Sequence, residues 1–85
     1  MAKELPFQLE IISPTSHQVL SVTGIEIESP TGSFFVGYDH MPLISIIKKK
    51  STLSYYLPDG SNMRIQVNGG IFNIAQNKSL ILLDS

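Results

Sequence analysis

The stretch GIEIESPTG, residues Gly24 to Gly32, carries both signals from which the fold class can be read. Ile25 and Ile27 alternate with glutamates, and a period of two places apolar side chains on one face of a β-strand and polar ones on the other. The run ends in SPTG, where proline presets φ for a turn and glycine accepts a positive φ. This stretch therefore predicts a half-buried strand that ends in a tight turn.

The same combination recurs along the chain. Alternation is found in FQLEI (residues 7–11) and NMRIQVN (62–68), and turn signals are found in PDG (58–60), NGG (68–70) and QNK (76–78). Short strands with turn signals every roughly 8–12 residues are typical of an all-β sandwich or barrel, and we count about nine candidate strands. We predict a single all-β domain, an antiparallel β-sandwich over residues 1–85. In NGG, the paired glycines predict a bulge or a close approach of two backbones.

The segment PLISIIKKK, residues 42–50, is ambiguous. Its apolar residues have helix-like spacing, and Pro42 stands where a first helical residue is tolerated. However, three closely spaced isoleucines lose rotamer freedom in a helix, which favours a strand.

Composition narrows the class of protein. The 85 residues are 42% hydrophobic and 15% charged, with a net charge of −1 and no cysteine. This is the composition of a folded globular domain, and it lacks the net basic charge with which proteins bind nucleic acids. The absence of cysteine suits a reducing compartment such as a cytoplasm. The longest apolar run, residues 80–83, is far shorter than the ~20 residues that span a bilayer, and no signal peptide is recognisable. We therefore expect association with a membrane only through a partner.

Few residues could carry chemistry. His40 follows Asp39, but adjacent residues of a strand point to opposite faces, so Asp39 is poorly placed to orient His40 in a catalytic triad. His40 and Asp39 also fall short of the four ligands of a structural metal site, and His17 is distant in sequence. We predict no catalytic, metal or cofactor site. Lys48–Lys50 followed by Tyr55 and Tyr56 are interpreted as a solvated turn and a packed strand rather than as a groove for single-stranded nucleic acid.

Three segments resemble one family. GSFFVGYDHMPL (residues 32–43) is similar to the stretch of the epsilon subunit of rotary ATP synthases in which Gly-Glu-Leu-Gly precedes Pro-Gly-His-Ala-Pro-Leu. VNGGIFNIAQNKSLILL (67–83) resembles the segment of that family that contains Val-Ser-Gly-Gly and Gln-Pro-Asn-Lys, and FQLEIISP (7–14) resembles its first strand. The resemblance covers nearly the whole chain. It implies a ten-stranded β-sandwich, in which residues 42–47 form a strand.

The resemblance also implies a function. Epsilon is a non-catalytic subunit of the central stalk, which binds the gamma subunit and the ring of membrane c subunits and couples ion-driven rotation to ATP synthesis. It is a peripheral protein on the cytoplasmic face of a bacterial inner membrane or an equivalent membrane. The implied gamma-facing residues are His40, Met41, Leu43, Ser45 and Ser13. The implied c-ring contacts are Thr31, Gly32, Ser33 and Glu28.

This chain departs from the family pattern at several positions. Thr31 and Ser33 stand where glutamates are frequent, and Phe35 replaces the second glycine of Gly-Glu-Leu-Gly. Tyr38 and Asp39 replace Pro-Gly, although aspartate can adopt the left-handed conformation that glycine would supply. The family's C-terminal pair of helices is absent from this sequence, so we expect neither ATP binding nor an inhibitory latch.

Two other functions stay open. A free-standing β-sandwich could bind carbohydrate or peptide on a platform formed by Tyr38, Tyr55 and Tyr56. A small hydrolase could use His40.

Overall fold

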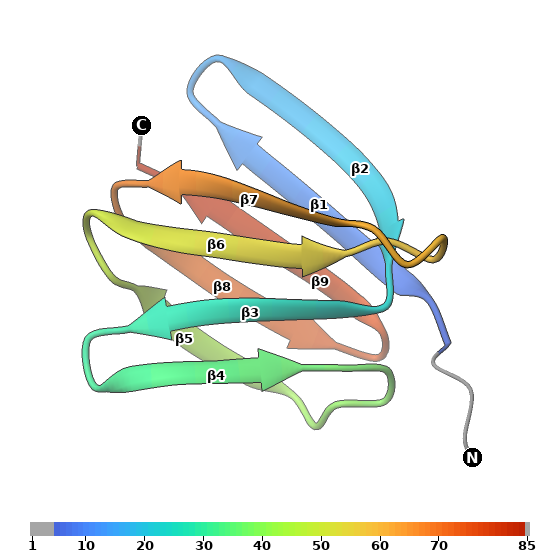
Figure 1. Cartoon of the computed structure of the whole chain (residues 1–85). Coiled ribbons are helices and arrows are strands. Elements are labelled where there is room, and N and C mark those ends of the chain that lie inside the picture. Colours follow the sequence, from blue (N-terminus) through green and yellow to red (C-terminus); the bar gives the residue numbers. More distant parts are fainter. Residues whose placement is uncertain (1–4, 85) are drawn as a thin grey trace.

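The structure is a computed structural model that describes residues 5–84, and nine β-strands form two sheets there without any helix (Figure 1). The predicted all-β sandwich is confirmed, with the number of strands expected from the sequence and one fewer than the resemblance implies. Residues 1–4 and Ser85, at the ends of the predicted domain, lie outside the described residues. The strands are β1 (Phe7–Ser13), β2 (Ser16–Val22), β3 (Gly24–Ser29), β4 (Gly32–Val36), β5 (Leu43–Ile47), β6 (Ser51–Tyr56), β7 (Asn62–Val67), β8 (Gly70–Ala75) and β9 (Lys78–Leu83).

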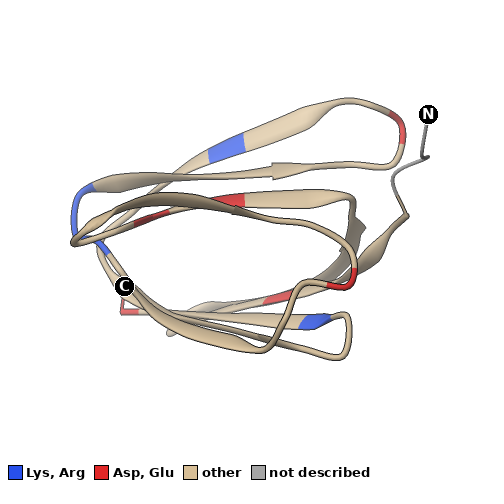
Figure 2. Ribbon diagram, turned by 90° about the horizontal axis from the view of Figure 1, so that it is seen from below, with Lys and Arg blue, Asp and Glu red and all other residues tan. Residues whose placement is uncertain are grey.

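The two sheets pack face to face. The five-stranded sheet has the order β2-β1-β9-β8-β5, and the four-stranded sheet has the order β4-β3-β6-β7. Neighbouring strands are antiparallel except β1 and β9, which run parallel. The parallel pair places β9 between β1 and β8, in the middle of the five-stranded sheet. Figure 2 shows the sandwich from below, with several of the charged residues at its turns.

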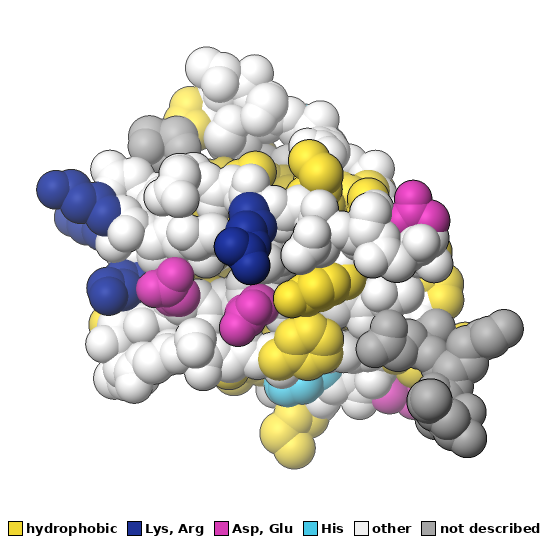
Figure 3. All heavy atoms as spheres, in the orientation of Figure 1, with side chains coloured by type: hydrophobic (Ala, Val, Ile, Leu, Met, Phe, Trp, Pro, Cys, Tyr) yellow, Lys and Arg dark blue, Asp and Glu magenta, His cyan; other side chains and the backbone are white. Residues whose placement is uncertain are grey.

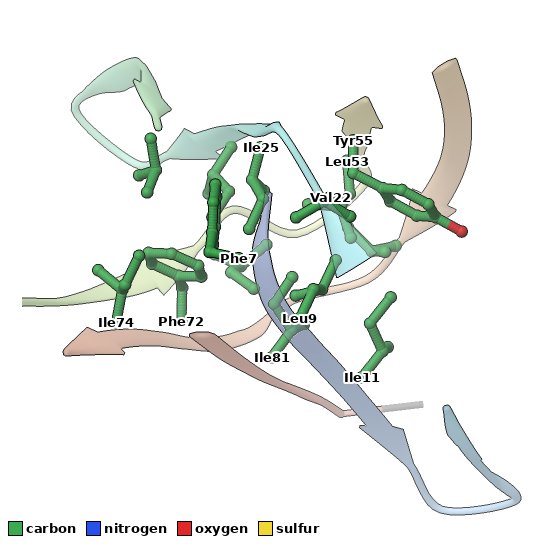
Figure 4. Packing of buried hydrophobic residues seen from close by; sticks show 14 residues of the cluster. Phe7, Leu9, Ile11, Val22, Ile25, Leu53, Tyr55, Phe72, Ile74 and Ile81 are labelled. Atoms are coloured by element: carbon green, nitrogen blue, oxygen red, sulfur yellow. The ribbon is translucent and has the colours of Figure 1, made fainter. Parts of the chain in front are cut away.

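Both sheets supply side chains to one core, which fills the space between them (Figure 4). Phe34 of β4 and Phe72 of β8 meet edge to face across this space, with ring centroids 6.2 Å apart. Such an arrangement is favourable for aromatic rings because the positive edge of one faces the negative surface of the other. The buried hydrophobic residues are Phe7, Leu9, Ile11, Val22, Ile25, Ile27, Val36, Ile47, Leu53, Tyr55, Val67, Phe72, Ile74 and Ile81.

The ambiguous segment is a strand. Leu43–Ile47 forms β5, which pairs with β8 at the edge of the five-stranded sheet. The paired glycines of NGG have the predicted role of a close backbone approach. Gly70 has a φ of 151°, and a Cβ built on it would lie 2.1 Å from the carbonyl oxygen of Leu82. At this position the chain can carry no side chain.

Phe35 has a clear packing role. Its ring lies over Gly24 on the outer face of the four-stranded sheet, so that a Cβ built on Gly24 would come within 2.3 Å of Phe35 Cζ. The ring centroid also lies 6.1 Å from that of Tyr56, with the planes tilted by 57°. Phe35 therefore occupies the space that the missing side chain of Gly24 leaves open.

Candidate partner-binding surfaces

The outer face of the five-stranded sheet is mainly apolar. Strand register places Ile46, Ile71, Leu82 and Ile12 side by side across β5, β8, β9 and β1. A second row contains Ile44, Asn73, Leu80, Glu10 and Val19. We call the apolar members of these rows the apolar face; they are Ile12, Val19, Ile44, Ile46, Ile71, Leu80 and Leu82.

The apolar face is unusually accessible to solvent. Ile44 is 71% exposed, Ile46 63% and Ile71 49%. In an antiparallel sheet that covers a core on one side only, the outward positions are normally polar. Contiguous apolar patches that span several strands are rare on monomeric soluble proteins and mark binding surfaces. The apolar face is therefore the main candidate surface for a partner.

Glu10 of β1 and His17 of β2 form a hydrogen-bonded pair on the same side of the sheet as the apolar face. His17 Nε2 lies 2.5 Å from Glu10 Oε2, and within residues 5–84 this is the one contact of 4.0 Å or less between a basic side chain and a carboxylate. His17 stands opposite Ile12 across the β1–β2 pair, and Glu10 stands opposite Leu80 across the β1–β9 pair. The first row thus ends at the polar His17, whereas Glu10 and Asn73 are polar members within the second row. Such a mixture of apolar and polar groups is usual in protein interfaces.

Leu43 and Ser45 do not belong to the apolar face. Leu43 pairs with Ile74 and Ser45 pairs with Phe72, and both of these partners are completely buried. Leu43 and Ser45 therefore point toward the core side of the sheet. The outward residues of β5 are Ile44 and Ile46, which sequence reasoning missed although both lie in the segment that it examined.

The loop before β5 holds His40 and Met41. The His40 amide donates a hydrogen bond to the carbonyl of Gly37 at 3.3 Å, and its Nδ1 lies 2.8 Å from the carbonyl oxygen of Met41. Met41 is 72% exposed, which makes it available to a partner.

Asp39 anchors this loop to the β8–β9 turn. Its amide donates to Asn77 Oδ1 at 2.7 Å, and Asn77 Nδ2 donates to Asp39 Oδ1 at 3.0 Å. Asp39 has a φ of 61°, the left-handed conformation expected for it from the sequence. Because its carboxylate bonds Asn77 and the His40 ring bonds a backbone carbonyl, this arrangement does not orient His40 for a hydrolase mechanism.

Ser13 lies far from His40. Its hydroxyl is 2.7 Å from that of Ser16, in the turn between β1 and β2. Ser13 follows Ile12, which pairs with Leu82 near the end of β9, whereas the loop of His40 is bonded to Asn77, just before the start of β9. Ser13 and the loop of His40 and Met41 thus lie at opposite ends of the sheet, with the apolar face between them, while Leu43 and Ser45 point away from that face.

The implied c-ring residues are close together. Thr31 lies in the turn between β3 and β4, and Gly32 and Ser33 begin β4. The Ser29 hydroxyl closes this turn by donating to the carbonyl of Gly32 at 2.7 Å. The Glu28 carboxylate accepts a hydrogen bond from the Thr52 amide at 3.2 Å. An open groove of about 550 Å³ extends from this turn over the four-stranded sheet; its lining includes Glu26, Glu28, Gly32, Ser33, Lys48 and Arg64.

The three tyrosines that the alternative function would need do not form a platform. Tyr55 is 4% exposed and packs in the core, so it cannot contribute to a surface. Tyr56 is half-buried against Phe35, and Tyr38 is exposed in the loop before β5. The alternation of β6 is the signal that identifies Tyr55 as buried, because Tyr55 is in phase with the buried Leu53.

The outer face of the four-stranded sheet differs in character from the apolar face. Figure 3, in which this sheet is in front, shows charged side chains of both signs around a small hydrophobic group. No cluster of three or more His, Asp or Glu side chains with the proximity of metal ligands occurs among the described residues. The part of the chain that the structure describes has no helix that is long and apolar enough to cross a membrane.

Comparison with known proteins places these surfaces in a family context. A family model described as "ATP synthase, Delta/Epsilon chain, beta-sandwich domain" matches residues 6–85, which agrees with the resemblance seen in the sequence. An "ATP synthase epsilon chain" of Anaeromyxobacter sp. (strain Fw109-5) is 28% identical over 79 residues, which are 91% of this chain and 58% of that relative. This chain therefore spans little more than half the length of the relative.

Two solved structures share the fold. One is a chain of the Euglena gracilis mitochondrial ATP synthase (OSCP/F1/c-ring), with a TM-score of 0.87 and 14% identity over 94% of this chain and 51% of that one. The other belongs to the central stalk/c-ring of the Tetrahymena thermophila mitochondrial ATP synthase, with a TM-score of 0.79 and 12% identity over 99% of this chain and 67% of that one. At such low identity the likeness concerns the fold alone.

Proposed function

Because this chain belongs to the family of ATP synthase delta/epsilon chains, through their β-sandwich domain, we propose that it is a central-stalk subunit of a rotary ATP synthase. Delta/epsilon chains are structural and regulatory subunits rather than catalytic ones. In this proposal the apolar face binds the gamma subunit, and the end of the sandwich with the β3–β4 turn meets the c ring. The protein then helps to couple ion-driven rotation to ATP synthesis, as a peripheral protein on the cytoplasmic face of an energy-coupling membrane.

The observation that carries the proposal is the apolar face. A subunit that transmits torque needs a contact that holds firmly, and stable interfaces bury more than about 1,000 Å² in total. The apolar face offers side chains from every strand of the five-stranded sheet. Glu10 and His17 add polar groups to this surface, and the exposed Met41, in the loop before β5, adds an adaptable contact.

Binding of gamma can be tested with one substitution at the centre of the apolar face. Ile71 lies between Ile46 and Leu82, so Ile71→Asp would place a carboxylate among apolar groups once gamma covers the face. We expect gamma affinity to fall by at least about tenfold, since a charge buried without a partner is strongly unfavourable. The measurement is co-purification with a co-expressed gamma subunit, followed by titration of the purified pair.

A matched control shows whether a new charge weakens gamma binding only on the apolar face or anywhere on the surface. Asn62 of β7 is exposed and stands opposite Tyr56, on the outer face of the four-stranded sheet. Asn62→Asp adds the same charge there and should leave gamma binding unchanged, and circular dichroism should show both variants folded. If the Ile71 variant retains gamma as well as the wild type does, the apolar face is not the gamma site.

We also propose that this chain does not bind ATP. In the groove beside the β3–β4 turn, the carboxylates of Glu26 and Glu28 offset the positive charges of Lys48 and Arg64, so the groove offers no net positive charge to a triphosphate. Isothermal titration with Mg-ATP should give no saturable heat, and saturable binding would contradict this expectation.

A further inference from the structure

The turn between β5 and β6 spreads three consecutive lysines over one end of the sandwich. All three are exposed. Lys48 lines the groove beside the β3–β4 turn, and Lys50 borders a second hollow at the end of β7. The stem of Lys49 crosses the β7–β8 turn, because a Cβ built on Gly69 would lie 3.2 Å from Lys49 Cγ. One short turn therefore places positive charge across the whole end.

Hydrogen bonds hold this turn in a defined shape. The Lys48 amide donates to the carbonyl of Glu28 at 2.8 Å, which joins the turn to β3. The Ser51 hydroxyl donates to the carbonyl of Lys48 at 2.7 Å. Lys50 has a φ of 54°, in the left-handed region that glycine adopts without strain.

The three ammonium groups have no carboxylate partner. Among the described residues, the one contact of 4.0 Å or less between a basic side chain and a carboxylate joins His17 and Glu10, on other strands. This turn holds three of the five lysines and arginines within residues 5–84, the other two being Arg64 and Lys78. The end of the sandwich is therefore locally positive although the chain has a net charge of −1.

We propose that the lysine end, defined as Lys48, Lys49 and Lys50, binds a protein surface that carries carboxylates. This inference rests on the proposed function, in which this end of the sandwich meets the c ring. It adds that the loops of the ring that contact the three lysines are acidic. Each exposed lysine–carboxylate pair contributes modestly, but three pairs on a preorganised turn also fix the orientation of the contact.

A lipid surface suits the lysine end less well. Segments that bind anionic lipids usually carry about 4–8 basic residues, each attracted to the same negative plane. Here there are three lysines, and two carboxylates belong to the same end. Glu28 accepts a bond from Thr52 beside the turn, and the Asp84 carboxylate lies next to Gly69. A negatively charged bilayer would repel these carboxylates, whereas a protein surface can avoid them.

The test compares the wild-type chain with the triple variant Lys48→Gln, Lys49→Gln, Lys50→Gln. Binding to the detergent-solubilised c ring of the same organism is measured by biolayer interferometry at about 50 and 300 mM KCl, where the screening of exposed charges differs strongly. We expect the triple variant to bind the ring about tenfold more weakly at the lower salt concentration and to lose most of the salt dependence. Lys78→Gln, at the opposite end of β9, should behave like the wild type.

Two further measurements distinguish the partners. Vesicles of phosphatidylglycerol and phosphatidylcholine in equal parts should not bind the wild type; if they do, and the triple variant does not, the partner is a lipid surface and the proposal is wrong. It is also overturned if the triple variant binds the ring as well as the wild type. The gamma affinity of the triple variant should be unchanged. If the triple variant binds the ring like the wild type while gamma binding is normal, only the inference about the lysine end is wrong. If the wild type does not bind gamma, the proposed stalk function itself is wrong.

Discussion

The contact between Phe35 and Gly24 leads to a prediction about a pair of substitutions. Gly24→Ala places a methyl group 2.3 Å from Phe35 Cζ and 2.7 Å from its Cε1. Gly24 is not among the residues with positive φ, so its backbone accepts alanine. The ring must therefore move away. If Phe35→Ala is made first, the space is empty and the methyl group meets no obstacle.

The expected energies follow from what the ring would lose. Phe35 is 52% exposed, so displacing its ring would lose at most about half of the 1.5–3 kcal/mol by which complete burial of a phenylalanine stabilises a fold. The contact with the Tyr56 ring adds about 0.5–1.5 kcal/mol. Replacing a strand glycine by alanine stabilises the fold by about 0.5–1 kcal/mol, because alanine loses less conformational entropy on folding. Gly24→Ala should thus cost about 0.5–2 kcal/mol in the wild type and be neutral or stabilising in the Phe35→Ala background.

Urea unfolding of the wild type, both single variants and the double variant measures this difference as a double-mutant cycle. A coupling free energy of about 1–3 kcal/mol is expected. In a domain of this size, a change of 1 kcal/mol shifts the melting temperature by about 4–8 °C, well within the reach of a thermal melt. Equal costs of Gly24→Ala in both backgrounds would refute the reasoning, because the ring would then not be the obstacle.

Three further substitutions test other contacts. Gly70→Ala should destabilise the fold by more than about 3 kcal/mol, because its Cβ would meet a backbone carbonyl of β9; normal solubility and melting would contradict this. Asn77→Ala should cost about 1 kcal/mol and speed hydrogen exchange of the Asp39 amide, to which Asn77 is bonded. The Ser61 hydroxyl and amide hold the pKa of Asp59 below its ordinary value. Ser61→Ala should raise that pKa in an NMR titration and reduce the stabilisation that is lost as pH falls through it.

The fold could be predicted because its strands are short, alternate apolar and polar residues, and are separated by typical turn residues. In β3, and in β1 as far as Ile11, the apolar residues occupy every second position, so the buried face follows directly from the sequence. The QNK turn also behaves as its residues imply: Gln76 and Asn77 have φ values of 52° and 62°, the left-handed values of a tight hairpin turn. For these strands and this turn, the local sequence is sufficient to predict the structure.

The binding face of β5 could not be predicted in the same way. The strand reads LISII, and four of its five residues are apolar, so alternation does not reveal which of them point outward. Pairing with β8 decides the matter: Leu43 is opposite a buried residue, and Ile44 is opposite an outward one. The binding face depends on a partner strand about thirty residues away, and a local pattern contains no information on that register.

The central position of β9 has a consequence during protein synthesis. Residues 78–83 are the last of the nine strands to leave the ribosome, yet they join β1 to β8. Until they emerge, the β1–β2 hairpin has no neighbour in its sheet, and the nascent chain exposes unpaired apolar strands to solvent. Pairing between strands so distant in sequence is slow, and chains in this condition are prone to aggregate. Translation of this protein should therefore depend on chaperones that shield it until the final strand is released.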